Sequence, residues 1–403
     1  MNDFSDLSLN ITKNISKVEK KNFGIFFTPN SIISLFIEEI CKINESHFEN
    51  VLEPSCGSCE FITYLDSKKI CSNIDGIEYN NYIYNSIKNV KYKNINVNVY
   101  NENFLDYKTN KKYELIIGNP PYFLIPNKNI KDDYIKYTVG KVNIFCLFIL
   151  HSLTMLKDDG ILGFIIPSSF LNSSSYLKIR THIIQNYCLN KIINYENKNN
   201  FIDTEQSTIG IIISNKKNRK SSYFININNN IYFTYNQKGV NNILVNYKTL
   251  TQMGLAVKTG TVVWNECKNI LTSNGNDTLL VYNTNIKNNK LHIVQTFTNK
   301  QKQQYIKKKG LNYPVIAVNR GHGNTKYKLS YCIIDTDKEF LLENHINYIY
   351  SPIISMDRNK LLELYNIVIK SFENKKTKLF IEYFIGNGSL SKSELQNIFP
   401  IFI

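Results

Sequence analysis

The chain has 403 residues, which is too long for one typical hydrophobic core, so two domains are expected. Hydrophobic residues make up 43% of it, with 27 Tyr and 23 Phe, and this composition excludes an intrinsically disordered protein. The net charge of +15 lies entirely in residues 216–403, which carry 26 Lys and Arg against 11 Asp and Glu, whereas residues 1–215 carry 22 of each.

The N-terminus and the apolar runs bear on location. The first residues, MNDFSDLSLN, contain neither a basic n-region nor an apolar h-region, so we expect no secretory signal and a cytoplasmic location. The longest apolar run, residues 144–156, includes His151 and is much shorter than the roughly 20 residues that span a bilayer, so no membrane segment is expected.

Cys56 and Cys59 form the one close pair among eight cysteines, and a single CxxC pair cannot complete a structural zinc site. We therefore expect no metal.

Residues 51–215 alternate short β-rich runs with helical patterns, which predicts a parallel sheet with crossover helices. This is the doubly wound, Rossmann-like layout of nucleotide-binding proteins. The predicted strands are Val51–Leu52, Ile74–Ile77, Val97–Tyr100, Glu114–Ile117, Gly160–Ile166, Lys191–Tyr195 and Thr208–Ser214. The predicted helices are Ser31–Lys42, Glu60–Asp66, Tyr82–Val90, Ile144–Leu156 and Ser175–Tyr187.

The basic stretch 215–220 follows the last of these strands and is the expected linker. It divides the chain into an N-terminal extension (1–23), a catalytic domain (24–215) and a basic domain (216–403). Short strands with Asn/Gly turns, and helical runs at 354–371 and 378–384, predict an α+β fold for the basic domain. A basic half beside a neutral half indicates a polyanion-binding module, with a lysine-rich composition as the alternative explanation.

The first predicted strand leads into Glu53-Pro54-Ser55-Cys56-Gly57. Small residues between a strand and a helix allow the backbone to approach a ligand. The second strand ends at Glu78, where an acceptor for ribose hydroxyls is expected. Because Glu53 would repel a pyrophosphate, a cationic adenosyl ligand fits this loop better.

Two further strand ends complete the predicted site, since the carboxyl ends of parallel strands share one edge of the sheet. After the third strand, Asn103 is positioned to meet the amine of an adenine ring and Phe104 to pack on that ring, although by itself this is an ordinary turn. The fourth strand leads into Asn119-Pro120-Pro121-Tyr122.

This tetrapeptide suits amine methylation. The amine of a nucleobase shares its lone pair with a π-system, and acceptors at the Asn119 side-chain oxygen and the Pro120 carbonyl would each take one N–H as positive charge develops. Proline has no N–H to compete, and Tyr122 would stack on a flat substrate. The alternative is an Asn-Pro turn that ends a buried strand.

Together these motifs resemble the gamma-class adenine-N6 DNA methyltransferases of restriction-modification systems, the N-6 DNA methylase family. Gly24–Pro29 resembles the segment that precedes the cofactor loop in this class, and the resemblance covers residues 24–215. It implies catalysis by Asn119, Pro120, Pro121 and Tyr122, and stacking of the target base between Tyr122 and Phe201. It implies S-adenosylmethionine binding by Thr28, Pro29, Glu53, Ser55, Cys56, Gly57, Glu78, Tyr79, Asn103, Phe104, Asn119 and Pro121.

The resemblance further implies double-stranded DNA as substrate, a flipped-out adenine, a monomer, and a cognate restriction endonuclease as candidate partner. In the basic half, 258–264 and 314–320 resemble target-recognition segments, so Lys258, Arg320 and Lys326 are expected DNA contacts. Two residues depart from the family pattern: Cys59 replaces a glycine and Asn103 replaces an aspartate. The first adds a Cβ beside the cofactor loop, and the second weakens the acceptor for the cofactor amine.

Two other functions fit the same motifs. An Asn-Pro-Pro-Tyr cradle also suits a methyltransferase that acts on RNA adenine or protein glutamine, although such enzymes generally carry a small domain before the fold. A catalytically silent DNA-binding homologue is the second alternative, because both departures fall in the cofactor site.

Overall fold

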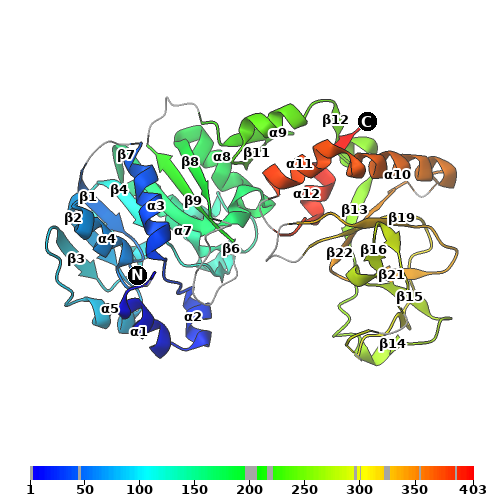
Figure 1. Cartoon of the computed structure of the whole chain (residues 1–403), viewed down its shortest axis with the longest axis horizontal. Coiled ribbons are helices and arrows are strands. Elements are labelled where there is room, and N and C mark those ends of the chain that lie inside the picture. The colour runs from blue at the N-terminus through cyan, green and yellow to red at the C-terminus, as the bar shows by residue number, and fades with distance from the viewer. Residues whose placement is uncertain are drawn as a thin grey trace. The chain divides into compact units, whose positions relative to one another are not determined.

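The computed structural model describes residues 3–43, 47–195, 207–215, 221–294, 297–299, 301–321, 327–353, 355–385 and 388–403. The chain divides into two compact units, residues 1–238 and 239–403. Figure 1 shows the elements of each unit. Within the described residues, none of the helices has the length and apolar character needed to cross a bilayer.

A seven-stranded sheet forms the centre of the first unit, with the order β3-β2-β1-β4-β7-β9-β8. All seven predicted strands are confirmed. Their bounds are β1 (Phe48–Glu53), β2 (Cys71–Ile77), β3 (Asn96–Tyr100), β4 (Tyr113–Gly118), β7 (Leu156–Pro167), β8 (Cys188–Asn194) and β9 (Thr208–Ser214).

The predicted parallel sheet is confirmed except at β9. This strand lies between β7 and β8 and pairs antiparallel with both. Every residue of β9 is buried, so its apolar run resembles that of a parallel strand covered on both faces. The sequence pattern therefore located the strand but did not reveal its direction.

Helices cover both faces of the sheet, and the five predicted ones are confirmed. Their bounds are α3 (Asn30–Cys41), α4 (Glu60–Lys68), α5 (Asn81–Ile87), α7 (Ile144–Met155) and α8 (Leu177–Asn186). Side chains alternate along each strand. Leu115 and Ile117 of β4 accordingly join the apolar cluster of α3 and α4, whereas Ile116 joins that of α7 and α8.

The chain outside these elements adds shorter pieces. The predicted N-terminal extension contains two helices, α1 (Asp6–Asn14) and α2 (Lys17–Phe23), which the sequence analysis had not located. After β4 come β5 (Leu124–Ile125), α6 (Asp132–Ile135) and β6 (Val142–Asn143), and β5 pairs with β6.

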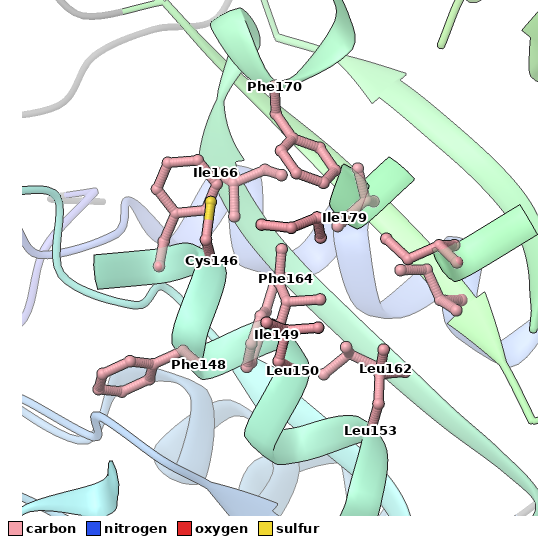
Figure 2. Close-up of a cluster of buried hydrophobic side chains, with 14 of the residues drawn as sticks. Cys146, Phe148, Ile149, Leu150, Leu153, Leu162, Phe164, Ile166, Phe170 and Ile179 are labelled. Atoms are coloured by element: carbon pink, nitrogen blue, oxygen red, sulfur yellow. The ribbon is translucent and has the colours of Figure 1, made fainter. Parts of the chain in front are cut away.

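Helix α7 is apolar on nearly every side, and most of its residues are buried. Figure 2 shows its Cys146, Ile149, Leu150 and Leu153 facing Leu162, Phe164 and Ile166 of β7, with Phe170 and Ile179 closing the cluster. Strand β7 also pairs with β4, the strand that leads into the predicted tetrapeptide. The packing of α7 on β7 therefore supports β4 as well.

The first unit continues past the predicted boundary at residue 215, because a hairpin packs onto it. Strands β10 (Phe224–Ile227) and β11 (Asn230–Phe233) form this hairpin. The fully buried Arg180 on α8 donates to Ile231 O (2.8 Å), Phe170 O (2.9 Å) and Ser173 O (2.9 Å). A buried guanidinium needs such acceptors, and one of them lies in the hairpin.

The second unit has the predicted α+β composition. One sheet has the order β13-β22-β19-β20 and the other the order β14-β18-β15-β21. The strand bounds are β13 (Ala256–Thr259), β14 (Leu271–Thr272), β15 (Thr278–Val281), β18 (Tyr305–Ile306), β19 (Val315–Asn319), β20 (Tyr331–Ile334), β21 (Phe340–Leu342) and β22 (Ile346–Tyr350). The helices α10 (Arg358–Glu373) and α11 (Lys375–Phe384) match the two predicted helical runs, and α12 (Lys392–Asn397) follows them.

One further helix and two short strand pairs belong to the described fold. Helix α9 (Gln237–Ile243) spans the division between the two units. In the second unit, β12 (Tyr247–Lys248) pairs with β23 (Ile401–Phe402), and β16 (Ile286–Lys287) pairs with β17 (Lys290–Leu291).

Replacing Leu162 by alanine tests the packing of α7 on the sheet. Leu162 is fully buried, so Leu162→Ala should lower the free energy of unfolding of the first unit by about 2–5 kcal/mol in a urea titration. Leu124→Ala is the matched control, because that leucine is 61% exposed and its loss should change stability by less than about 0.5 kcal/mol. Equal effects of the two substitutions would contradict the described core.

Candidate functional site

A cavity of about 460 Å³ lies at the carboxyl edge of the sheet, where the residues after β1, β2, β3 and β4 meet the segment 23–28. The structure brings together all but one of the residues predicted to bind the cofactor. Those that line the cavity are Thr28, Glu53, Ser55, Cys56, Gly57, Glu78, Tyr79, Asn103, Phe104, Asn119 and Pro121. The exception is Pro29, which is the N-cap residue of α3.

Hydrogen bonds hold the predicted cofactor loop against the end of β2. The backbone N–H of Cys56 donates to Ile77 O (2.9 Å), and that of Gly57 donates to Glu78 Oε2 (2.9 Å). Gly57 has a φ of 51°, and a Cβ there would lie 3.2 Å from the ring of Phe27. The close approach and the left-handed backbone both favour glycine at this position.

Glu78 is a buried carboxyl that accepts from two backbone N–H groups. Besides Gly57, the N–H of Asn80 donates to its Oε1 (2.7 Å). Burial raises the pKa of Glu78 to about 7, although these N–H groups oppose the shift. The carboxyl is thus held rigidly at the cavity wall, as an acceptor for hydroxyl groups requires.

Glu53 gives the best test of whether the site fits a cationic ligand. Its side chain is buried, and its Oε2 has no hydrogen-bond partner among the described residues. Burial raises the pKa of Glu53 well above its ordinary value, and the neighbouring Glu78 and Glu60 add to the shift. A positive group in the cavity would stabilise the ionised carboxyl, so the residues present fit S-adenosylmethionine, which carries a sulfonium and an ammonium group.

Cys59 adopts a backbone conformation that explains why a glycine is expected there. Its φ is 61°, in the left-handed region, at the N-cap of α4. For a residue with a Cβ this conformation costs about 1–2 kcal/mol. The thiol is buried in the apolar cluster of α3 and α4 and does not line the cavity.

The loop after β3 contains Asn103 and Phe104, the two residues predicted to contact adenine. Both ends of the Asn103 side-chain amide form hydrogen bonds within this loop. Asn103 Oδ1 accepts from the N–H of Leu105 (3.2 Å), and its Nδ2 donates to Asp106 Oδ2 (2.6 Å). An aspartate at 103 would place two carboxylates in contact, so the neighbouring Asp106 favours the amide found here. Phe104 is buried between Phe148 and His151, with ring centroids 4.9 and 4.8 Å apart.

The Asn119 side chain is held in one orientation by partners on both of its ends. Its Nδ2 donates to Phe26 O (3.1 Å) and to Thr28 Oγ1 (3.1 Å), and its Oδ1 accepts from the hydroxyl of Tyr122. Because a carbonyl can only accept, Phe26 O fixes which end of the amide is nitrogen. Neither contact was predicted, because a backbone carbonyl such as Phe26 O leaves no trace in a sequence and Thr28 was expected to bind the cofactor.

Two members of the predicted catalytic tetrapeptide, Pro120 and Tyr122, do not line the cavity. Pro120 is buried, and no described residue donates a hydrogen bond to its carbonyl. The Tyr122 hydroxyl also contacts Ile165 O (2.8 Å), and its ring meets Phe145 edge-on at 6.2 Å. Stacking of Tyr122 on a substrate base stays a prediction.

The remaining predicted contacts lie elsewhere. Phe201 and Lys326 fall outside the described residues. In the second unit, Lys258 Nζ lies 4.7 Å from the ring centroid of Tyr350, and Arg320 donates to Asn344 O (2.8 Å). Their roles in DNA binding stay predictions.

Comparison with known proteins gives the following relatives. Residues 55–201 match the family described as Eco57I restriction-modification methylase. The chain is 28% identical to the modification methylase CviBIII of Paramecium bursaria Chlorella virus NC1A over 99% of both chains. It is 32% identical to the type II methyltransferase M.AccI of Acinetobacter calcoaceticus over 50% of this chain and 38% of that one. The cryoEM structure of a DrdV-DNA complex matches 93% of this chain and 54% of that chain with a TM-score of 0.52 and 15% identity.

The raised pKa of Glu78 predicts a pH dependence of stability. The folded protein holds this proton more tightly than the unfolded chain, so its contribution is full below about pH 4 and is lost as the pH rises through about 7. Compared with Glu78→Gln, the wild-type protein should lose about 2–3 kcal/mol between about pH 5 and pH 8 in urea titrations. Glu102→Gln, at an exposed glutamate of the same cavity, should follow the wild-type profile. Parallel profiles for wild type and Glu78→Gln would contradict the raised pKa.

Proposed function

We propose that this chain is a restriction-modification DNA methylase with the Rossmann-like fold of S-adenosylmethionine-dependent methyltransferases, and that it methylates N6 of a flipped-out adenine in double-stranded DNA. The observation that carries the proposal is the placement of Asn119. Its fixed side-chain amide lies in the wall of the same cavity as the Gly57 loop and Glu78. An acceptor for an amine and a binding site for an adenosyl cation are thus adjacent.

S-adenosylmethionine supplies an electrophilic methyl group when it is bound. The protein's own contribution is to prepare the nucleophile. Asn119 Oδ1 has a second lone pair beside the one that Tyr122 uses, and the Pro120 carbonyl is a second acceptor close in sequence. Two acceptors for the two N–H bonds of the amine stabilise positive charge as the nitrogen bonds to the methyl carbon and the bond from that carbon to sulfur breaks. The methylated nitrogen then loses one proton to water, so no carboxylate base is required.

Base flipping supplies the geometry for this attack. Extrusion of a base costs a few kcal/mol, and stacking on Tyr122 and Phe201 would offset part of it. A base held this way would present its amine to the cavity at a fixed distance and angle, which contributes much of the acceleration in two-substrate reactions.

Three observations support DNA as the substrate. The full-length relatives are named as type II or modification methylases, and the solved structure that matches 93% of the chain is a DNA complex. The excess of basic residues beyond residue 215 suits a polyanion. The names of these relatives also lead us to propose a cognate restriction endonuclease as partner, and the monomer that the resemblance implies stays a prediction.

The Asn119→Ala variant tests the catalytic role. Methyl transfer from tritiated S-adenosylmethionine to DNA should fall below detection, because the amine loses its main acceptor, while cofactor affinity in calorimetry should stay within about twofold of wild type. Asn186→Ala, at an exposed asparagine of α8, is the matched control and should retain full activity. Mass spectrometry of the digested DNA product identifies the base that is modified.

Each rival function gives a different result in that experiment. N6-methyladenine from the wild-type protein supports the proposal, whereas N4-methylcytosine would contradict the choice of base. Transfer to RNA or to protein glutamine, with none to DNA, would favour the alternative substrates. A protein that neither binds S-adenosylmethionine nor methylates DNA would be a silent homologue.

The basic unit leads to a prediction about salt. The logarithm of DNA affinity should fall linearly with the logarithm of salt concentration, and Lys258→Ala should weaken binding and reduce the slope by about one. Lys258 is exposed, so its loss should leave folding intact. Lys42→Ala, at an exposed lysine of the first unit, is the control and should not change the slope. Fluorescence anisotropy with a labelled duplex measures both quantities.

A further inference from the structure

Thr28 occupies an unusual position for a residue expected to bind the cofactor. Its hydroxyl oxygen accepts from Asn119 Nδ2 at 3.1 Å, although the two residues are 91 positions apart in the chain. The side chain is only 4% exposed. Phe26 O takes the other hydrogen of the same nitrogen, so both N–H bonds of the Asn119 amide have acceptors.

These two acceptors affect the opposite end of the amide. Hydrogen-bond acceptors at the two N–H bonds polarise the amide, because hydrogen bonds in a chain polarise one another. They favour the amide resonance form that carries negative charge on oxygen. Oδ1 then accepts more strongly from an amine that becomes positive during attack. The same contacts limit rotation of the side chain about its last bond.

Thr28 itself is held by rigid neighbours. Pro29, the N-cap of α3, follows it with a fixed φ of −61°, and the N–H of Ile33 donates to Pro29 O (3.1 Å). Helix α3 in turn places Ile33 and Phe36 fully in the core. The Thr28 hydroxyl is thus held in place by the buried face of α3, which packs on the sheet.

The segment before Thr28 also lies close to the backbone of residues 121–122 of the tetrapeptide. Gly24 has a φ of 63°, and a Cβ built on it would lie 2.5 Å from the backbone nitrogen of Tyr122 and 3.2 Å from the carbonyl carbon of Pro121. Only glycine allows this approach. Residues 24–28 therefore contact the tetrapeptide at two points: the Asn119 amide and the backbone of residues 121–122.

We propose that Thr28 is a positioning residue for methyl transfer: its hydroxyl, together with Phe26 O, orients and polarises the Asn119 amide that receives the amine. The proposal rests on the proposed function, in which Asn119 Oδ1 is the acceptor. It gives the segment 24–28 a role in the chemical step besides forming a wall of the cofactor cavity.

Two substitutions at Thr28 separate positioning from cofactor contact. Thr28→Val keeps the shape and removes the acceptor, and Thr28→Ser keeps the acceptor. In single-turnover reactions at saturating S-adenosylmethionine and DNA, Thr28→Val should be about tenfold slower and Thr28→Ser should stay within about twofold of wild type. The dissociation constant for S-adenosylmethionine in calorimetry and the KM for DNA should change less than the rate in both, because the Thr28 hydroxyl is engaged by Asn119. Thr181→Val, which removes the hydroxyl bonded to Leu177 O on α8, is the matched control with the wild-type rate.

A double-mutant cycle tests the contact without any turnover. Urea unfolding of Thr28→Val, Asn119→Ala and the double variant should show a coupling of about fivefold in the unfolding equilibrium constant. Independent effects of the two substitutions would show that Thr28 does not act through Asn119.

The outcomes separate this inference from the proposed function. A wild-type rate for Thr28→Val, or a raised cofactor dissociation constant with an unchanged rate at saturation, would overturn the positioning role alone. Methylation by the wild type of a base other than adenine would overturn the proposed base but still test Thr28, because any exocyclic amine needs the same acceptor. Absence of all methyl transfer by the wild-type protein would overturn both.

Discussion

The parallel pairing of β1, β2, β3 and β4 is the constraint on which the site depends. Parallel registers place the carboxyl ends of all four strands on one edge of the sheet. Helices cover both faces of the sheet around β1 and β4, whose last residues before the edge are buried and apolar, so the polar side chains that follow gather at that edge. The cavity therefore collects one polar loop per strand, and its chemistry follows from four short segments far apart in sequence.

The strand ends alone do not complete the cavity. The segment 24–28 closes it, and this segment is fixed by α1 and α3. Ser5, at the start of α1, donates to Glu60 on α4 through its N–H (3.1 Å) and its hydroxyl (2.6 Å). The predicted N-terminal extension thus packs against the helix that follows the cofactor loop. Ile25 and Phe27 of the segment 24–28 also pack against the cluster of Ile11, Ile15 and Ile83, which links α1 to the cavity wall.

Much of the fold could be predicted from the sequence because buried strands and amphipathic helices have distinct periods. The direction of β9 could not, since a strand buried on both faces has the same pattern in either direction. Most of the cavity residues were found because they lie at the ends of predicted strands, whereas Thr28 was found through the resemblance of 24–29 to the family segment. The partners of Asn119 were not found, because one is the backbone carbonyl of Phe26 and the other was assigned to the cofactor. The hairpin held by Arg180 was placed in the second domain because its anchor is a set of carbonyls.

The electrostatics of the cavity complement its geometry. Glu53 and Glu78 are both buried, and burial raises the pKa of each, so the cavity disfavours the negative charge that these carboxyls would otherwise carry. A ligand with positive charge reverses this preference, because ionised carboxyls then gain a Coulomb partner in a poorly solvated space. A neutral or anionic nucleotide has no such effect and would meet an unfavourable carboxylate at Glu53. Burial thus disfavours two bare anions at Glu53 and Glu78, a preference that suits a cationic cofactor, whereas Asn119 contributes an amide that does not ionise. The two carboxyls and the amide lie in the wall of one cavity, and the strained Cys59 lies outside it.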